Sequence, residues 1–66
     1  MRLIVNGKEF DFSFGTTVLH LLQQLHLENY PVAVERNGQI VSHLRFDQTE
    51  LAEGDSLELV TLVGGG

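Results

Sequence analysis

The sequence predicts an α+β fold in which a mixed sheet of four to five strands carries one main helix on one face. Two Asn-Gly pairs, Asn6-Gly7 and Asn37-Gly38, indicate tight hairpins, because a type I′ turn requires positive φ at both central residues. Segments on either side of these pairs alternate between apolar and polar residues, as strands do. Between the hairpins, apolar residues recur at helical spacing over residues 18–25. A chain of 66 residues has room for one domain with a small core.

The first two strands are predicted over residues 1–5 and 8–14. Ile4 makes both faces of the first strand partly apolar, which suits a strand with a neighbour on each side. In the second strand one face carries three aromatic residues, Phe10, Phe12 and Phe14. We interpret these rings as one wall of the core. A platform for stacking a ligand is the weaker interpretation, because so small a domain has few other large residues to fill its interior.

The helix is predicted to follow Gly15, with Thr16 or Thr17 as its N-cap, because a threonine oxygen accepts hydrogen bonds from the first turn. Its end is predicted at Asn29, which tolerates the left-handed conformation that often terminates helices. The apolar stripe consists of Val18, Leu21, Leu22 and Leu25. A helix of this length is not stable alone in water, so the stripe should dock on the sheet.

Three further strands are predicted over residues 32–36, 39–41 and 56–63. Residues 42–48 have no clean period and are expected to form an irregular crossing with one helical turn, pinned by Leu44 or Phe46. The element order is therefore β-β-α-β-β-β. This order, with the helix between the second and third strands, is that of an α+β roll of the β-grasp type.

Composition and charge favour a soluble protein of the cytoplasm. There is no cysteine, which agrees with a reducing compartment, and no apolar run approaches the length of a membrane span. The formal net charge is −5, which disfavours nucleic acid because phosphates would be repelled. The charge would instead steer the domain towards a basic protein surface. The competing interpretation is that the charge only keeps a small protein soluble.

The sequence offers no catalytic apparatus of its own. His20 and His26 lie six positions apart on the predicted helix and His43 lies in the irregular segment, so we expect solvated histidines and no metal site. The glycines lack the spacing of a phosphate-binding loop. The protein is therefore expected not to be an enzyme.

The remaining candidate is the C-terminal stretch. We predict a folded domain over residues 1–63, followed by a flexible glycine tail of Gly64, Gly65 and Gly66. Residues 63–66 would span about 14 Å when extended, enough to carry a carboxylate into a partner's active site. A disordered chain end without function is the competing interpretation.

These features resemble the ThiS family, the ubiquitin-like sulfur carriers of thiamine biosynthesis. The resemblance covers essentially the whole chain. It rests on the pattern Leu51-x-x-Gly54-Asp55-x-Leu57-Glu58-Leu59 before a final Leu62-Val63-Gly64-Gly65-Gly66. The terminal Gly65-Gly66 pair is its most specific part, and ubiquitin and the small subunit of molybdopterin synthase share that pair.

The resemblance implies a function. In that family an adenylating enzyme related to the ubiquitin-activating class consumes ATP to adenylate the terminal glycine, here Gly66. A sulfur-donor protein of a cysteine desulfurase route then supplies sulfur, and the resulting thiocarboxylate donates it to thiazole synthase. The carrier holds no permanent cofactor. Gly64 and Gly65 would occupy the channel of the partner.

Apolar residues of the last predicted strand extend this hypothesis to a docking surface. Val60 and Leu62 are expected on the sheet face away from the helix, and together with Val63 they would contact a partner next to the tail. Ordinary surface hydrophobicity is the alternative. Two other functions stay open, the small subunit of molybdopterin synthase and a ubiquitin-like protein modifier, with a plain interaction domain as a third.

Overall fold

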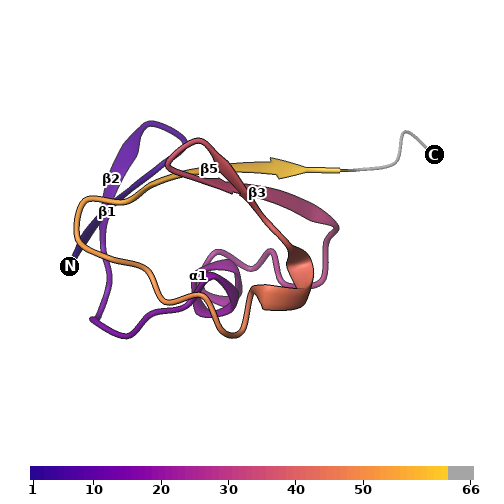
Figure 1. The fold of residues 1–66 in the computed structure, drawn as a ribbon, viewed down its shortest axis with the longest axis horizontal. Coiled ribbons are helices and arrows are strands. Elements are labelled where there is room, and N and C mark those ends of the chain that lie inside the picture. Colours follow the sequence, from indigo (N-terminus) through magenta and orange to yellow (C-terminus); the bar gives the residue numbers. More distant parts are fainter. Residues whose placement is uncertain (63–66) are drawn as a thin grey trace.

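The computed structural model describes residues 1–62, and within them the strands form one mixed five-stranded sheet. The strands are β1 (Arg2–Val5), β2 (Lys8–Asp11), β3 (Val32–Arg36), β4 (Gln39–Val41) and β5 (Ser56–Thr61). The helix α1 (Val18–Gln24) lies against one face of the sheet, and a short 3-10 helix, η1 (His43–Arg45), follows β4 (Figure 1). The predicted element order and the α+β roll are confirmed.

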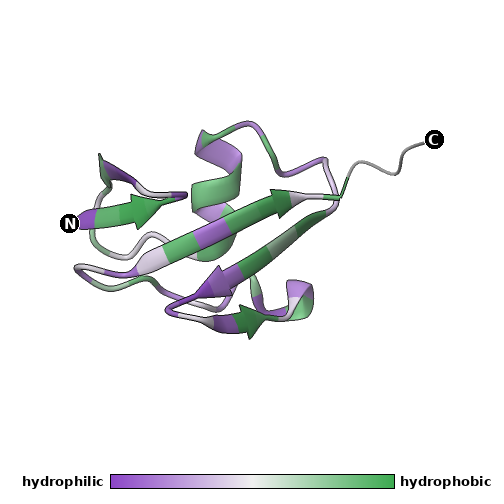
Figure 2. Ribbon diagram, turned by 90° about the horizontal axis from the view of Figure 1, so that it is seen from above, coloured by the Kyte–Doolittle hydropathy of each residue, from purple (hydrophilic) through white to green (hydrophobic). Residues whose placement is uncertain are grey.

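The sheet order is β2-β1-β5-β3-β4, so the last strand of the chain lies in the middle. β5 runs parallel to β1 and antiparallel to β3, and Figure 2 shows β3 beside it. Both outer pairs, β1 with β2 and β3 with β4, are antiparallel hairpins. Each hairpin turns at its Asn-Gly pair, where φ is 50° and 82° at Asn6 and Gly7 and 51° and 84° at Asn37 and Gly38. The predicted type I′ turns are therefore confirmed.

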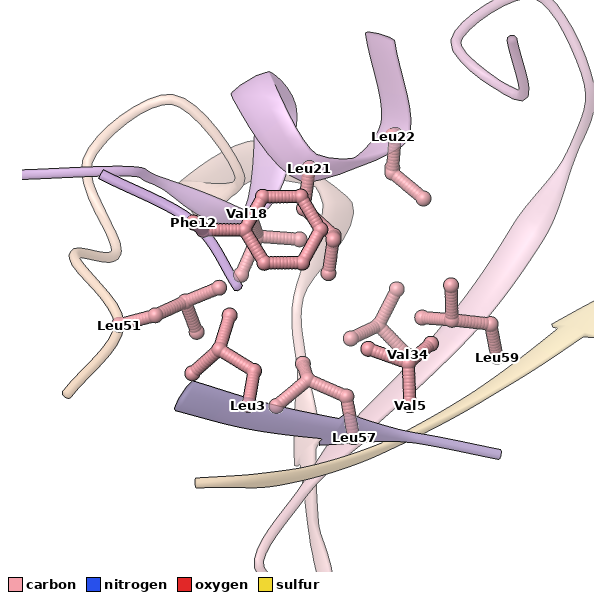
Figure 3. Close-up of a cluster of buried hydrophobic side chains, with 10 residues drawn as sticks. All are labelled: Leu3, Val5, Phe12, Val18, Leu21, Leu22, Val34, Leu51, Leu57 and Leu59. Atoms are coloured by element: carbon pink, nitrogen blue, oxygen red, sulfur yellow. The ribbon is translucent and has the colours of Figure 1, made fainter. Parts of the chain in front are cut away.

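The core lies between the sheet and α1. Side chains of the sheet point towards those of the helix (Figure 3). Phe12 and Leu51, which belong to neither the helix nor a strand, complete the cluster at one side. The buried cluster consists of Leu3, Val5, Phe12, Val18, Leu21, Leu22, Val34, Leu51, Leu57 and Leu59. Leu25 is only partly buried at the edge of this cluster. Each fully buried Leu or Val contributes about 1.5–3 kcal/mol, so the helical stripe accounts for much of the stability of this small domain.

The predicted aromatic wall is wrong for two of its three members. β2 ends at Asp11, so the alternation does not continue to residue 14. Phe12 reaches the core, but Phe10 retains 38% of its surface and Phe14 retains 78%. Phe10 lies on β2, an edge strand with a neighbour on one side only, so its ring stays partly exposed. Beyond Phe12, whose backbone still bonds Met1, the chain turns at Gly15, where φ is 90°. Strand periodicity therefore no longer determines where Phe14 points.

The helix ends earlier than the sequence predicted. Thr17 is the N-cap, as one of the two predicted candidates, and its side chain accepts a hydrogen bond from the N–H of His20 at 3.2 Å. The last helical residue is Gln24, and His26, not Asn29, adopts the left-handed conformation with φ of 60°. Within residues 1–62 no helix has the length and hydrophobicity needed to cross a membrane.

The remaining boundaries agree closely with the prediction. The irregular crossing contains the expected helical turn, η1, and it is Phe46 that packs against the core, whereas Leu44 is 76% exposed. The predicted last strand over 56–63 is described as far as Thr61, and residue 63 lies outside the described part.

Candidate functional site

β5 carries the chain from the middle of the sheet towards its last residues. Leu57 is fully buried and Leu59 retains 8% of its surface, so the core fixes one face of this strand. Neighbouring strands flank it on both sides, β1 and β3. The N–H of Leu62 still donates to the carbonyl of Pro31 at 2.7 Å. The chain is therefore held by backbone hydrogen bonds up to the last described residue.

A buried carboxylate fixes the start of β5. Asp55 lies in the turn before the strand, and its side chain accepts from three donors: Arg36 Nε at 2.8 Å, Asn37 Nδ2 at 3.0 Å and the N–H of Ala52 at 2.8 Å. Burial acts to raise the pKa of this carboxyl, but the three hydrogen bonds and the positive charge of Arg36 outweigh it and hold the pKa below its ordinary value. Asp55 is therefore a structural anion, ionised wherever the protein is folded near neutral pH.

Two asparagines serve as strand partners as well as turn residues. The side chain of Asn6 accepts from the N–H of Leu59 at 2.7 Å and donates to its carbonyl at 3.2 Å. The side-chain amide thereby replaces one residue of a neighbouring strand. Asn37 Oδ1 accepts from the N–H of Ser56 at 2.9 Å. The two hairpin turns thus hold β5 at Ser56 and at Leu59.

The predicted docking residues lie at the far end of the same strand. Val60 is 56% exposed and Leu62 is 54% exposed, as expected for apolar residues that are available to a partner. Val63, Gly64, Gly65 and Gly66 lie outside the described residues. Whether the named residues contact a partner stays a prediction.

Val60 belongs to the sheet face that points away from α1. Val60 stands directly opposite Ala33 on β3, and Glu58 stands directly opposite Glu35. All four alternate with the core residues of their strands, so they share the outer face. This face therefore combines apolar side chains with a pair of facing carboxylates, a combination that suits an apolar partner surface bordered by basic groups.

Leu62 lies at a second surface. It lines a hollow of about 480 Å³, between the loop that precedes β3 and η1. The other lining residues are Glu28, Tyr30, Pro31, Val32, His43 and Phe46. Val60 and Leu62, two positions apart in sequence, therefore lie at different surfaces, the outer sheet face and this hollow, and the prediction that both lie on the outer face is wrong for Leu62.

The three histidines lie at different sites in the fold. His20 Nδ1 accepts from the N–H of Thr17 at 3.4 Å and completes a capping box, which gives it a role in the helix start. His26 lies just past the helix end, and His43 lines the hollow beside Leu62. Among residues 1–62 no three His, Cys, Asp or Glu side chains gather in a way that could hold a metal ion.

Sequence reasoning did not identify the polar anchors of β5. Asn6 and Asn37 were expected only to supply positive φ, and Asp55 only to form a turn. Their long-range partners, Leu59 and Arg36, have no local sequence pattern that connects them. The one available signal was the Gly54-Asp55 pair within the family-like motif.

Comparison with known proteins shows the family to which the chain belongs. A sequence model of the ThiS family matches residues 3–66. The chain belongs to the ThiS family. The sulfur carrier protein ThiS of Bacillus subtilis is 42% identical over 65 residues, which cover 97% of this chain and 98% of that protein. The crystal structure of the thiamine biosynthesis protein ThiS from Geobacter metallireducens superposes with a TM-score of 0.82 at 36% identity, over the full length of both chains. The fold is thus the ubiquitin-like β-grasp of this family.

A second kind of relative is longer. A thiazole synthase of Paramagnetospirillum magneticum is 44% identical over 66 residues, which cover 100% of this chain but 20% of that protein. A thiazole synthase of Magnetococcus marinus matches in the same way at 38% identity. The chain therefore spans about a fifth of the length of these two relatives.

Proposed function

We propose that this protein carries sulfur for thiamine biosynthesis as a thiocarboxylate on Gly66. The observation that supports this most is the match to the Bacillus subtilis sulfur carrier, which extends over nearly all of both chains. The two thiazole synthases that contain a similar stretch support the acceptor, because a carrier sequence within a synthase indicates that the two activities work together. They favour the thiamine branch over molybdopterin synthesis.

The proposed chemistry needs an activating partner. A carboxylate is a poor electrophile, so an adenylating enzyme would let a Gly66 oxygen attack the α-phosphorus of ATP, with pyrophosphate as the leaving group. Persulfide sulfur from a cysteine desulfurase route, released at the level of sulfide by a thiol that is oxidised to a disulfide, would then attack the carbonyl carbon, and AMP would leave. The enzyme supplies the charge stabilisation. This protein supplies the acyl group and no permanent cofactor, and acts as a carrier and co-substrate.

The fold suits such a carrier. Asp55, Asn6 and the buried leucines hold β5 in the middle of the sheet, and this strand leads into the glycine tail. We propose that Gly64 and Gly65 occupy the partner's channel, and that Val60, Leu62 and Val63 contact its surface beside it. A glycine tail suits a narrow channel because it adds no side-chain bulk.

Intact-mass spectrometry tests the proposal. The protein is incubated with the adenylating enzyme, magnesium ATP and sulfide, and the expected result is the mass gain for replacement of one oxygen by sulfur. Deletion of Gly66, or Gly66→Ala, should abolish the gain while the melting temperature stays unchanged, because neither variant touches the described core. A full mass gain in the deletion variant would refute Gly66 as the acceptor.

Growth distinguishes the thiamine branch from the alternatives. A strain without this protein should grow when the thiazole moiety of thiamine is supplied, and should not grow without it on thiamine-free medium. Rescue that requires a molybdenum cofactor precursor, or covalent conjugates of the protein in cell extracts, would instead support one of the other two functions.

A further inference from the structure

The two edges of β5 are paired over different lengths. On one side β3 pairs along the strand from Leu57, opposite Arg36, to Thr61, opposite Val32. On the other side the pairing with β1 covers only Ser56 and Leu57. The second half of β5 therefore has a neighbouring strand on one side only.

The hydrogen bonds of β5 show which of its backbone groups point to each side. The carbonyl of Leu57 accepts from the N–H of Asn6 at 2.9 Å, and both backbone groups of Leu59 bond the side chain of Asn6, so these residues face β1. The N–H of Leu62 bonds the carbonyl of Pro31, on the side of β3. Because the direction alternates along a strand, the N–H and the carbonyl of Thr61 point to the side of β1.

Within residues 1–62 no strand pairs with Thr61 on the β1 side. β1 ends at Val5, and the turn at Asn6-Gly7 takes the chain away into β2. Asn6 extends the pairing by one step, to Leu59, and none of the hydrogen bonds found among residues 1–62 reaches Thr61 on this side. A backbone donor and acceptor thus lie open at the end of a central strand.

We infer that this open edge accepts an extended segment of the adenylating enzyme as an added strand, paired with Thr61. This inference rests on the proposed function. A donor and an acceptor on the same residue of an extended chain match the backbone of another extended chain, which is the basis of recognition by strand addition. The edge leads directly into the tail, so a strand that pairs there would align the tail with the enzyme's channel. Other small domains cover or charge such edges to prevent unwanted pairing.

Amide hydrogen exchange followed by NMR tests this directly. In the free protein the Thr61 amide should exchange quickly, whereas the amides of Leu59 and Leu62, which have partners, should exchange slowly. Addition of the adenylating enzyme with magnesium ATP should slow the Thr61 amide at least tenfold and leave the amide of Leu59 nearly unchanged.

A variant adds a measurement of affinity. Thr61→Pro removes the N–H at a position where β3 does not use it, so the melting temperature should change little. Its dissociation constant for the enzyme should rise about tenfold, the effect of losing one backbone hydrogen bond. Thr61→Val keeps the N–H and should bind like the wild type. If Thr61→Pro unfolds the protein, the exchange rates of the wild type decide.

The outcomes separate the two proposals. A thiocarboxylate that forms on Gly66 while the Thr61 amide stays fast in the complex overturns strand addition and leaves the carrier function intact. Concentration-dependent protection of Thr61 without enzyme would overturn it in favour of a second copy of this chain on the same edge. If Gly66 gains no sulfur, the carrier function fails, and the partner named here fails with it.

Discussion

Replacement of Asp55 by alanine should destabilise this protein more than any other single loss of charge on the described chain. The carboxylate retains 9% of its side-chain surface and accepts three hydrogen bonds. A hydrogen bond to a charged group contributes about 1.5–3 kcal/mol. With one bond lost outright and the other two partly replaced by water, we expect a loss of about 3 kcal/mol.

This loss is large for so small a domain. At about 0.05–0.15 kcal/mol per residue, the total free energy of unfolding is about 3–10 kcal/mol. Since 1 kcal/mol corresponds to about 4–8 °C for a domain of this size, the melting temperature should fall by about 12–24 °C. Asp55→Asn should not restore it, because Oδ1 and Oδ2 both face donors, and the amide nitrogen must replace one of them.

Thermal unfolding by circular dichroism measures the effect, with Asp47→Ala as a control that removes the same charge from an exposed position. The pH dependence has a defined sign. Because the pKa of Asp55 is lowered in the folded state, its contribution is complete above the unfolded value of about 3.9 and is lost as the pH falls through the folded value. The difference in melting temperature between the wild type and Asp55→Ala should therefore become smaller in acid. Equal melting temperatures for the Asp55 and Asp47 variants at neutral pH would refute this account of the turn.

Two further predictions concern the surface. Leu62→Glu should weaken binding to the adenylating enzyme with little change in melting temperature, because Leu62 is 54% exposed and lines the hollow between the loop before β3 and η1. Leu44→Glu makes the same change at an exposed residue outside that hollow and should bind normally, and equal affinity of both variants would argue against docking there. Glu58→Gln should raise the free energy of unfolding by about 0.2–1 kcal/mol, since it removes like-charge repulsion with Glu35 directly opposite, and the gain should shrink in high salt. Glu28→Gln, outside the sheet, is the control for that measurement, and an equal gain there would show that the relief is not local.

Local patterns were sufficient for most of the fold. The Asn-Gly turns and the helical stripe act within a few residues, and both appear where the sequence predicted them. The errors arise where a local rule competes with another. Phe14 continues the strand alternation in sequence, but the chain has already left the sheet. Asn29 satisfies the rule for a helix end, yet His26 adopts the left-handed conformation three residues earlier.

The candidate site was only partly predictable for a physical reason. The exposure of Val60 follows from strand alternation, which is local, whereas Leu62 lies past the end of β5 and lines the hollow instead of the outer face. The hold of Asn6 on Leu59 joins residues 53 positions apart, and no periodicity encodes it. The same is true of the open edge beside Thr61, which exists because β1 is shorter than β5.

The position of β5 explains why one strand can serve both stability and delivery. A central strand gains two neighbours and a buried face, and those contacts are concentrated between Ser56 and Leu59. Its last two residues keep one neighbouring strand, and Val60 is exposed. Anchoring and recognition are therefore separated along a single strand. On the proposed function, this separation would let each of two enzymes bind and release the end of the strand without disturbing the core.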